Sequence, residues 1–147
     1  GFVVQPHVSL MEEKGLGKVL LWVSDRMDYQ IAAIVYGERM LKERDIGSAF
    51  MRAYRKSTDY YYKRGLLAMK ENRTSEADEV LGIIAKYTEV GKELVAKGLN
   101  YNDPEGRLDL KDIQRQLEWL SKEGLLKKRL TPAEVVDDSF LNQILKN

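Results

Sequence analysis

The sequence feature that most constrains the fold is an uninterrupted apolar run, IAAIVY, at Ile31–Tyr36. A run without alternation has no face suited to water, so it predicts a strand buried on both sides under helices. The segment after Gly37 has apolar residues at helical spacing along one side: Ile46, Ala49, Phe50, Ala53, Tyr54 and Tyr61. A strand followed by a helix that packs on it is half of an α/β unit. We therefore predict an α/β fold organised around Tyr29–Tyr62.

Only two more strand candidates accompany this run, Phe2–Val4 and Lys18–Val23. All three lie before residue 37, and the sequence after Tyr62 has helical patterning to its end. The sequence thus predicts a helix-rich α/β chain with about three strands at its N-terminal side. It also predicts that part of the sheet is missing from these 147 residues.

Local signals predict where several helices begin and end. Pro6 suits the first turn of a short helix, and Gly15 suits its end. Two further helices are expected, one from Thr74 or Ser75 to about Thr88 and a short one with Leu94 and Val95 that ends near Gly98. A long helix is expected from Asp109 to Gly124. Near the end of the chain we expect a capping box at Thr131 and Glu134, and a last helix that begins at Asp138 or Ser139.

Composition excludes several kinds of chemistry. Lys and Arg number 24 against 23 Asp and Glu, so the net charge of +1 gives no argument for nucleic acid or an anionic membrane surface. The chain has no cysteine and one histidine, which removes disulfides, thiolate metal sites and Cys/His pairs. No apolar run approaches the roughly 20 residues that span a bilayer. We predict no catalytic residue, no metal site, no cofactor and no enzymatic activity.

Four motifs favour structural roles. Gly15–Lys18 superficially resembles a phosphate loop but lacks its spacing and the Ser or Thr after lysine. Tyr60–Tyr62 point in three directions on a helix, which favours packing over one aromatic platform. Lys127–Arg129 is typical of a solvated helix end. Trp22 and Trp119 are expected to pack, although an exposed Trp119 would mark a contact surface.

Several stretches, taken in order, resemble one family. They are Phe2–Lys14 with Gly15 and Lys18–Leu20, Ala33–Arg44 with Phe50–Tyr54, Val80–Thr88, and the ending made of Asp103–Leu108, Leu117–Trp119, Glu123–Leu125 and Val135–Phe140. Together these are similar to the C-terminal part of the substrate-binding proteins of ABC importers for nitrate, sulfonates such as taurine, and thiamine-pyrimidine precursors, the NMT1/THI5-like group. The resemblance covers nearly the whole chain.

The resemblance implies a C-terminal fragment of a two-lobed periplasmic-binding-protein type II fold. Residues 1–28 would be a remnant of the second lobe and the crossover, and residues 29–147 would return to the first lobe. The function implied is the solute-binding component of an ABC importer for a small organic or inorganic anion or a pyrimidine precursor. It further implies a bacterial exported location, periplasmic or membrane-anchored outside the cell, and a transporter permease as partner. No nucleic acid partner is expected, and the fragment could form a homodimer or exchange elements with a second copy.

Four residues are the candidate ligand contacts. Gln5 and His7 follow a predicted strand end, where α/β folds place ligand contacts. Tyr29 and Gln30 precede the central run, at the place where the family's chain crosses between lobes. Each also has a structural interpretation, surface exposure for His7 and hinge packing for Tyr29. The family usually has Glu where this chain has Gln5, which argues against a cationic ligand.

Two other functions remain open. One is a fragment of a THI5-like pyrimidine-synthesis enzyme, whose histidine and cofactor-binding lysine would belong to a front region that is not in this sequence. The other is a helical protein-interaction module, favoured if the helices after Thr74 presented an exposed apolar groove around Leu117 and Trp119.

Overall fold

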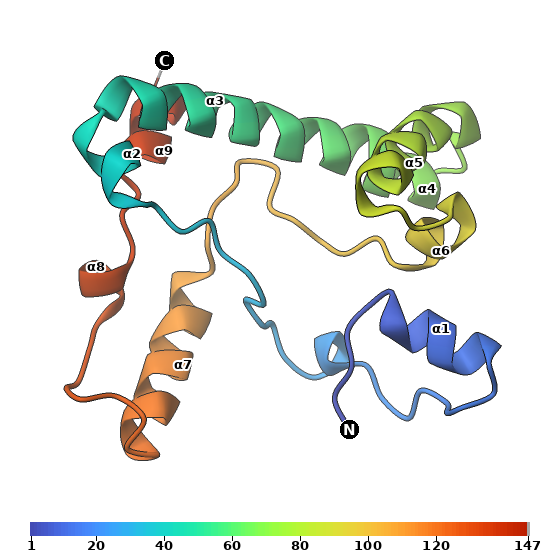
Figure 1. Ribbon diagram of the computed structural model, residues 1–147, viewed down its shortest axis with the longest axis horizontal. Helices are drawn as coiled ribbons and strands as arrows, with labels where there is room; N and C mark the ends of the chain where they lie inside the picture. The colour runs from blue at the N-terminus through green and yellow to red at the C-terminus, as the bar shows by residue number, and fades with distance from the viewer. Residues whose placement is uncertain (147) are drawn as a thin grey trace. The chain divides into compact units, whose positions relative to one another are not determined.

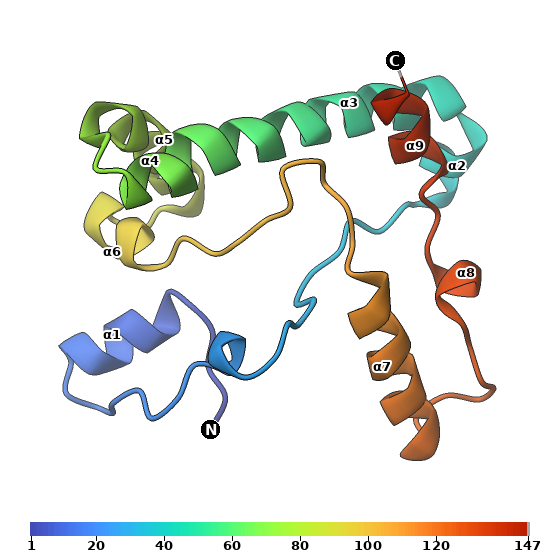
Figure 2. The ribbon, with the colours of Figure 1, turned by 180° about the vertical axis from the view of Figure 1, so that it is seen from behind.

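The computed structural model describes residues 1–146, shown from two sides in Figures 1 and 2. Every element of regular structure in these residues is helical. The elements are α1 (His7–Glu13), the 3₁₀ turn η1 (Val23–Asp25), α2 (Glu38–Lys42), α3 (Arg44–Tyr60), the π-helical η2 (Tyr61–Leu67), α4 (Ala68–Lys70), α5 (Thr74–Thr88), α6 (Lys92–Lys97), α7 (Leu110–Lys122), α8 (Pro132–Val135) and α9 (Ser139–Leu145).

The predicted α/β fold with about three strands is wrong, because residues 1–146 contain no strand. Phe2–Val4 is irregular, and Lys18–Trp22 is irregular up to η1. The central run Ile31–Tyr36 belongs to a drawn-out segment between η1 and α2 (Figure 1). The run is also not buried on both sides, since Val35 is 88% exposed.

The physical reason is that strand structure is a property of a pair. A single extended chain has no hydrogen-bond ladder, and its exposed amides bond to water unless a second strand lies alongside. The apolar composition of Ile31–Tyr36 did not lead to burial either, since residues 31–35 are exposed. The inference from composition to a sheet failed, because the described residues supply no neighbouring strand.

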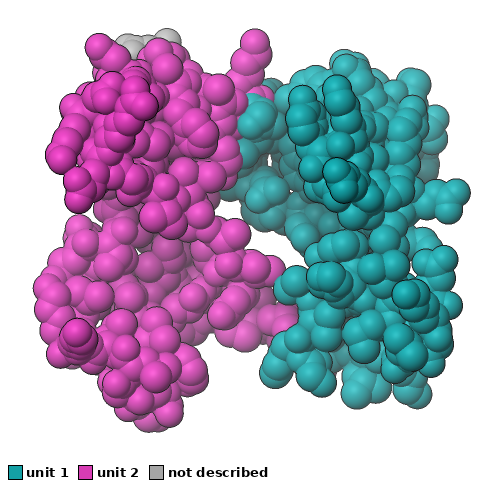
Figure 3. Space-filling model, viewed as in Figure 1, with its two compact units in different colours: residues 1–22, 57–104 teal, residues 23–56, 105–147 magenta. Residues whose placement is uncertain are grey.

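The chain divides into two compact units, coloured separately in Figure 3. Unit 1 comprises residues 1–22 and 57–104, and unit 2 comprises residues 23–56 and 105–147. The predicted lobe boundaries at residues 28 and 29 remain a prediction.

In unit 1, α5 is the central helix and packs against η2, α4 and α6. Its buried residues Ala77, Val80 and Leu81 recur at the three- and four-residue spacing that places side chains on one face. Gly65 in η2 allows a close approach, since a Cβ there would lie 2.9 Å from Val80 Cγ1. A small residue at this position therefore fixes how near the π-helical turn comes to α5.

In unit 2, the core forms where α9 lies against the first half of α3 (Figure 2). Phe140 is fully buried and packs with Met51 and Leu141. Arg44 lies 4.1 Å above the Phe140 ring and donates a hydrogen bond to Ser139 Oγ at 2.8 Å. The same arginine thus covers the core ring and holds the start of α9.

The buried face of α3 differs from the predicted apolar stripe. Ile46 and Phe50 are 43% and 46% exposed, whereas Gly47, Ser48 and Met51 are buried. The prediction assumed a sheet beneath the Ile46 side. In the structure the first half of α3 is covered by α9, and a small residue at 47 makes room for Phe140.

The predicted helix boundaries are confirmed where local signals set them. Gly15 and Gly124 have φ of +65° and +69° just after α1 and α7. The Asp109 carboxylate accepts hydrogen bonds from the N–H groups of Lys111 and Asp112. Thr131 and Glu134 form the expected capping box. These are interactions within a few residues, so sequence alone specifies them.

Replacing Gly47 by alanine should destabilise the protein although alanine favours helices. The new Cβ would lie 2.5 Å from Phe140 Cε1 and 3.0 Å from the Met40 carbonyl oxygen. We expect a loss of about 1–3 kcal/mol in the free energy of unfolding, measured by urea titration with circular dichroism. The matched control is Gly82→Ala in α5, where the nearest atom is the mobile Lys92 Cε at 3.2 Å. That variant should equal or exceed wild-type stability, and equal stability of both variants would contradict the packing described.

Candidate functional site

Gln5 and His7 lie in unit 1, at the start of α1. Gln5 Oε1 accepts hydrogen bonds from Ser9 N–H at 3.3 Å and Ser9 Oγ at 2.9 Å. The Gln5 side chain also lies close to Gly98, where a Cβ would come within 3.2 Å of Gln5 Cβ. His7 is exposed. In the described residues the Gln5 amide nitrogen donates no hydrogen bond, so this amide and the His7 imidazole remain available as donors.

Tyr29 and Gln30 lie in unit 2, just before the apolar run. Tyr29 is half-exposed, at 52%. Gln30 bonds to α7 and its capping residue: its N–H donates to Asp112 Oδ2 at 2.6 Å, and its Oε1 accepts from Asp109 N–H at 3.0 Å. Its carbonyl accepts from Gln116 Nε2 at 3.0 Å. We call this set of bonds the Gln30 clamp.

Asp112 is the centre of the clamp and is only 3% exposed. Besides Gln30, its carboxylate accepts hydrogen bonds from Gln116 Nε2 at 2.6 Å and from Arg115. Arg115 also donates to the Asp28 carbonyl. Burial by itself would raise the pKa of Asp112, but the bonds from Gln30, Gln116 and Arg115 lower that pKa below its usual range.

Sequence reasoning missed the role of α7 in the clamp. Asp112, Arg115 and Gln116 have the i, i+3, i+4 spacing of an ordinary exposed helix face, and such triplets usually form surface pairs. The partner that buries Asp112 is Gln30, 82 residues earlier.

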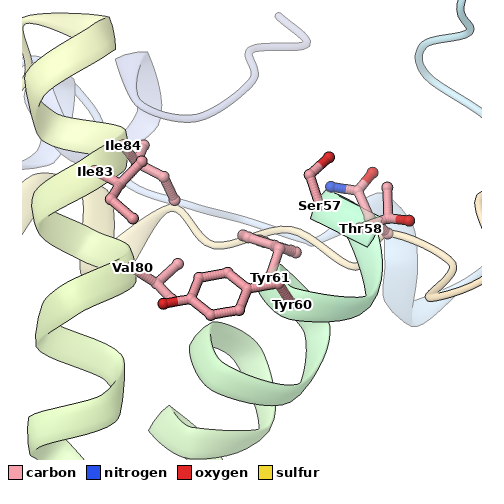
Figure 4. A pocket seen from close by; sticks show the side chains of 8 residues that line it. Ser57, Thr58, Tyr60, Tyr61, Val80, Ile83 and Ile84 are labelled. Carbon is pink, nitrogen blue, oxygen red and sulfur yellow. The ribbon is translucent and has the colours of Figure 1, made fainter. Parts of the chain in front are cut away.

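Unit 1 contains a hollow of about 280 Å³, shown in Figure 4. The apolar side chains Val80, Ile83 and Ile84 of α5 face Tyr60 and Tyr61 across it. Three small polar residues complete its rim: Ser57, Thr58 and Asn102. No charged side chain lines this hollow. The hollow therefore suits an apolar group, and it offers no cation that could pair with an anionic ligand.

The three consecutive tyrosines make different contacts, as predicted from their three directions on the helix. Tyr61 donates a hydrogen bond to the Asn100 carbonyl at 2.6 Å, and burial raises its pKa. Tyr60 is hydrogen-bonded to Glu79, which raises the pKa of its phenol. Tyr62 packs edge-on against Tyr101 with ring centroids 6.1 Å apart. They therefore form no common stacking platform.

A second hollow, of about 240 Å³, lies in unit 2 between the start of the apolar run and α7. Gln30–Ala33 form one side, and the other side is made by Ile113, Gln116, Leu117 and Leu120. Trp119 on the same helix is 56% exposed. Trp119 is thus exposed, and the contact surface that such exposure would mark stays a prediction.

The described part of the chain holds no cluster of three or more His, Asp or Glu side chains able to bind a metal ion. A search of the same residues found no helix with the length and hydropathy needed to cross a bilayer.

Comparison of the chain with protein-family models, with curated proteins and with solved structures found no match in any of the three.

The Gln30 clamp predicts a specific pH dependence of stability. Because the folded pKa of Asp112 is lower than its unfolded value of about 4, its contribution is complete above that value and is lost as pH falls through the folded pKa. Asp112→Asn should therefore cost about 1–3 kcal/mol in the free energy of unfolding at neutral pH, and less in acid. Urea titrations of both proteins at several pH values measure this difference.

The matched control is Asp78→Asn, which removes an exposed carboxylate paired with Lys92 at 2.8 Å. Exposed pairs contribute little, so this variant should stay within about 0.5 kcal/mol of wild type. A pH-independent difference for Asp112→Asn, or an equal effect of both variants, would contradict the clamp.

Proposed function

We propose that this chain is the C-terminal portion of the solute-binding component of an ABC importer. The observation that carries the proposal is the order and spacing of the four family-like stretches, which run from Phe2 to Phe140. Each stretch alone is a common turn, strand or helix, and the proposal depends on their collinear order. The proposal includes export from a bacterial cell and delivery of the solute to a membrane permease.

The helical stretches of the resemblance are consistent with the proposal, whereas the stretches that resemble strands of the family, at Phe2–Val4, Lys18–Leu20 and Ala33–Tyr36, are not strands here. Gln5 and Pro6 lead directly into α1, and Gly15 ends that helix region with a left-handed conformation. The Val80–Thr88 stretch is the second half of α5, and Leu117–Trp119 lies within α7. The stretches that resemble helices of the family are therefore helical here as well.

The hydrogen-bond donors of the candidate residues favour a solute that is anionic or rich in hydrogen-bond acceptors. The Gln5 amide, the His7 imidazole and the half-exposed Tyr29 hydroxyl can each donate a hydrogen bond. Nitrate and sulfonate oxygens and pyrimidine carbonyls are acceptors of such bonds. Gln30 is committed to the clamp, so its role in this proposal is to position Tyr29.

Uptake by cells tests the proposal directly. Disruption of the encoding gene should abolish growth on, or uptake of, one solute among nitrate, sulfonates and thiamine-pyrimidine precursors. Complementation with His7→Ala should restore uptake about tenfold less well than wild type, because the variant loses one hydrogen bond to the solute. The control is Tyr87→Ala, a 79% exposed tyrosine in α5. Unchanged uptake of all three solute classes after disruption would refute the function.

The isolated chain should bind its solute weakly. Solute binding that is coupled to closure depends on contacts from the whole protein, and we propose that this chain is only its C-terminal portion. Isothermal titration of the 147-residue chain with nitrate, taurine or a pyrimidine should give a dissociation constant no tighter than about 1 mM. Micromolar affinity would show that these residues form a complete site and would contradict the lobe assignment.

A second candidate function is a helical interaction module. The hollow beside Leu117 and the exposure of Trp119 favour it, because both are apolar features of α7 that the rest of the described chain leaves uncovered. Uptake that is independent of the gene, together with a partner that binds at Trp119, would favour this function over transport.

A further inference from the structure

The connection between α7 and α8 carries three consecutive basic residues, Lys127, Lys128 and Arg129. Their sequence pattern predicts a helix end, but α7 already ends at Lys122, and residues 125–131 are irregular. All three basic side chains are exposed. The run therefore lies in an exposed, irregular connection of unit 2.

The backbone of this connection is held only at its two ends. Leu125 N–H donates to the Leu120 carbonyl of α7 at 2.9 Å, and Thr131 N–H donates to the Glu134 carboxylate at 2.9 Å. Between these two bonds, no N–H or carbonyl of residues 126–130 makes a hydrogen bond within the described part of the chain. This stretch can therefore change conformation without breaking a backbone hydrogen bond.

The basic side chains are constrained as little as the backbone. Lys127 and Arg129 make no hydrogen bond or ion pair with any described residue. Lys128 Nζ lies 3.1 Å from Glu134 Oε1, but the two side chains are 71% and 43% exposed, and such surface pairs contribute little. Accessible Lys and Arg side chains are the groups that trypsin-like proteases select through an acidic specificity pocket.

We propose that Lys127–Arg129 is a cleavage site for an endoprotease of trypsin-like specificity that acts on the folded chain. Exposed irregular segments are the preferred places for such cuts, because a helix must open before its backbone fits an active site. The reaction is hydrolysis of one peptide bond after a basic residue. Water adds across the C–N bond, and one fragment ends in a carboxylate while the other begins with an amino group.

Other basic residues outside the described helices are held more firmly. Those before α7 are Lys14, Lys18, Arg26, Arg73 and Arg107. Arg73 and Arg107 are ion-paired to glutamates. The N–H groups of Lys14 and Arg26 donate to carbonyls about one turn earlier, at 3.1 and 2.9 Å. Lys18 is a single basic residue, and the next N–H donates to the Glu12 carboxylate at 3.2 Å. Among the described residues, only the run at 127–129 combines consecutive basic side chains with an unbonded backbone.

A cut at this run would divide unit 2. The fragment after the cut contains α8 and α9, and α9 supplies the fully buried Phe140. After cleavage, α9 would stay on α3 only through noncovalent contacts, such as the packing of Phe140 on Met51 and the hydrogen bond from Arg44 to Ser139 Oγ. The cut therefore removes the covalent link between the core of unit 2 and the helix that covers it.

Limited digestion of the full native chain with trypsin, followed by mass spectrometry of the fragments, tests the site. The first cut should follow Lys127, Lys128 or Arg129. Replacing all three by glutamine should slow cleavage in this connection at least about tenfold, because glutamine brings no positive charge to the specificity pocket. The variant should keep the wild-type circular dichroism, since the three side chains are exposed and form one surface pair at most.

The matched control is Lys18→Gln, which removes an exposed basic residue from another irregular segment and should leave the first cut unchanged. Lys111 and Lys122 of α7 serve as internal comparisons and should be cut later, because the helix must open first. A first cut after any basic residue from Lys14 to Lys122, or a triple variant cut in this connection at the wild-type rate, would overturn the proposal. Neither result depends on solute binding, so the proposed transport function and the cleavage site can fail separately.

Discussion

The backbone of a non-helical apolar segment must find hydrogen-bond partners outside itself, and this requirement governs unit 2. A helix satisfies its amides internally, while Ile31–Tyr36 cannot. The structure satisfies the residue just before the run, where Gln30 N–H donates to the buried Asp112 carboxylate at 2.6 Å. The six amides that follow remain unpaired within the described residues. The Asp112 carboxylate thus determines where the segment starts and where it contacts α7.

The two ends of the segment connect this constraint to the rest of unit 2. Asp112 binds the segment to α7, and Tyr36 brings it to the core around Phe140. That core in turn depends on Gly47, which lets the Phe140 ring lie against α3. Weakening either anchor would release the segment from one side. The segment is therefore anchored at both ends, while its own amides stay unpaired within the described residues.

The sequence predicted the features that depend on neighbours a few residues apart. The end of α1 near Gly15, the cap at Asp109 and the capping box at Thr131 all follow from short-range hydrogen bonds and backbone conformation. The strand at Ile31–Tyr36 was wrong because pairing requires a partner far away in sequence or in another chain. The buried face of α3 was wrong for the same reason, since the stripe through Ile46 and Phe50 was assigned to a sheet that the described residues do not form.

The candidate site shows the same division between local and distant information. Gln5, His7 and Tyr29 were chosen for their places in the sequence, and the structure leaves their donors accessible. Gln30 was chosen as a ligand contact, but the structure assigns its side chain and backbone to the clamp. Its partner Asp112 could not be predicted, because nothing within α7 indicates that this carboxylate is buried by a residue 82 positions away.

Amide hydrogen exchange, followed residue by residue by NMR, tests the central claim that the segment is anchored at Gln30 and open beyond it. In dilute solution the Gln30 amide should exchange slowly, because it donates to a buried carboxylate, while the amides of residues 31–36 should exchange at rates near those of an unstructured chain. Slow exchange of residues 31–36 in the dilute monomer would reveal a partner strand within the chain and contradict this account. Fast exchange at Gln30 would contradict it equally.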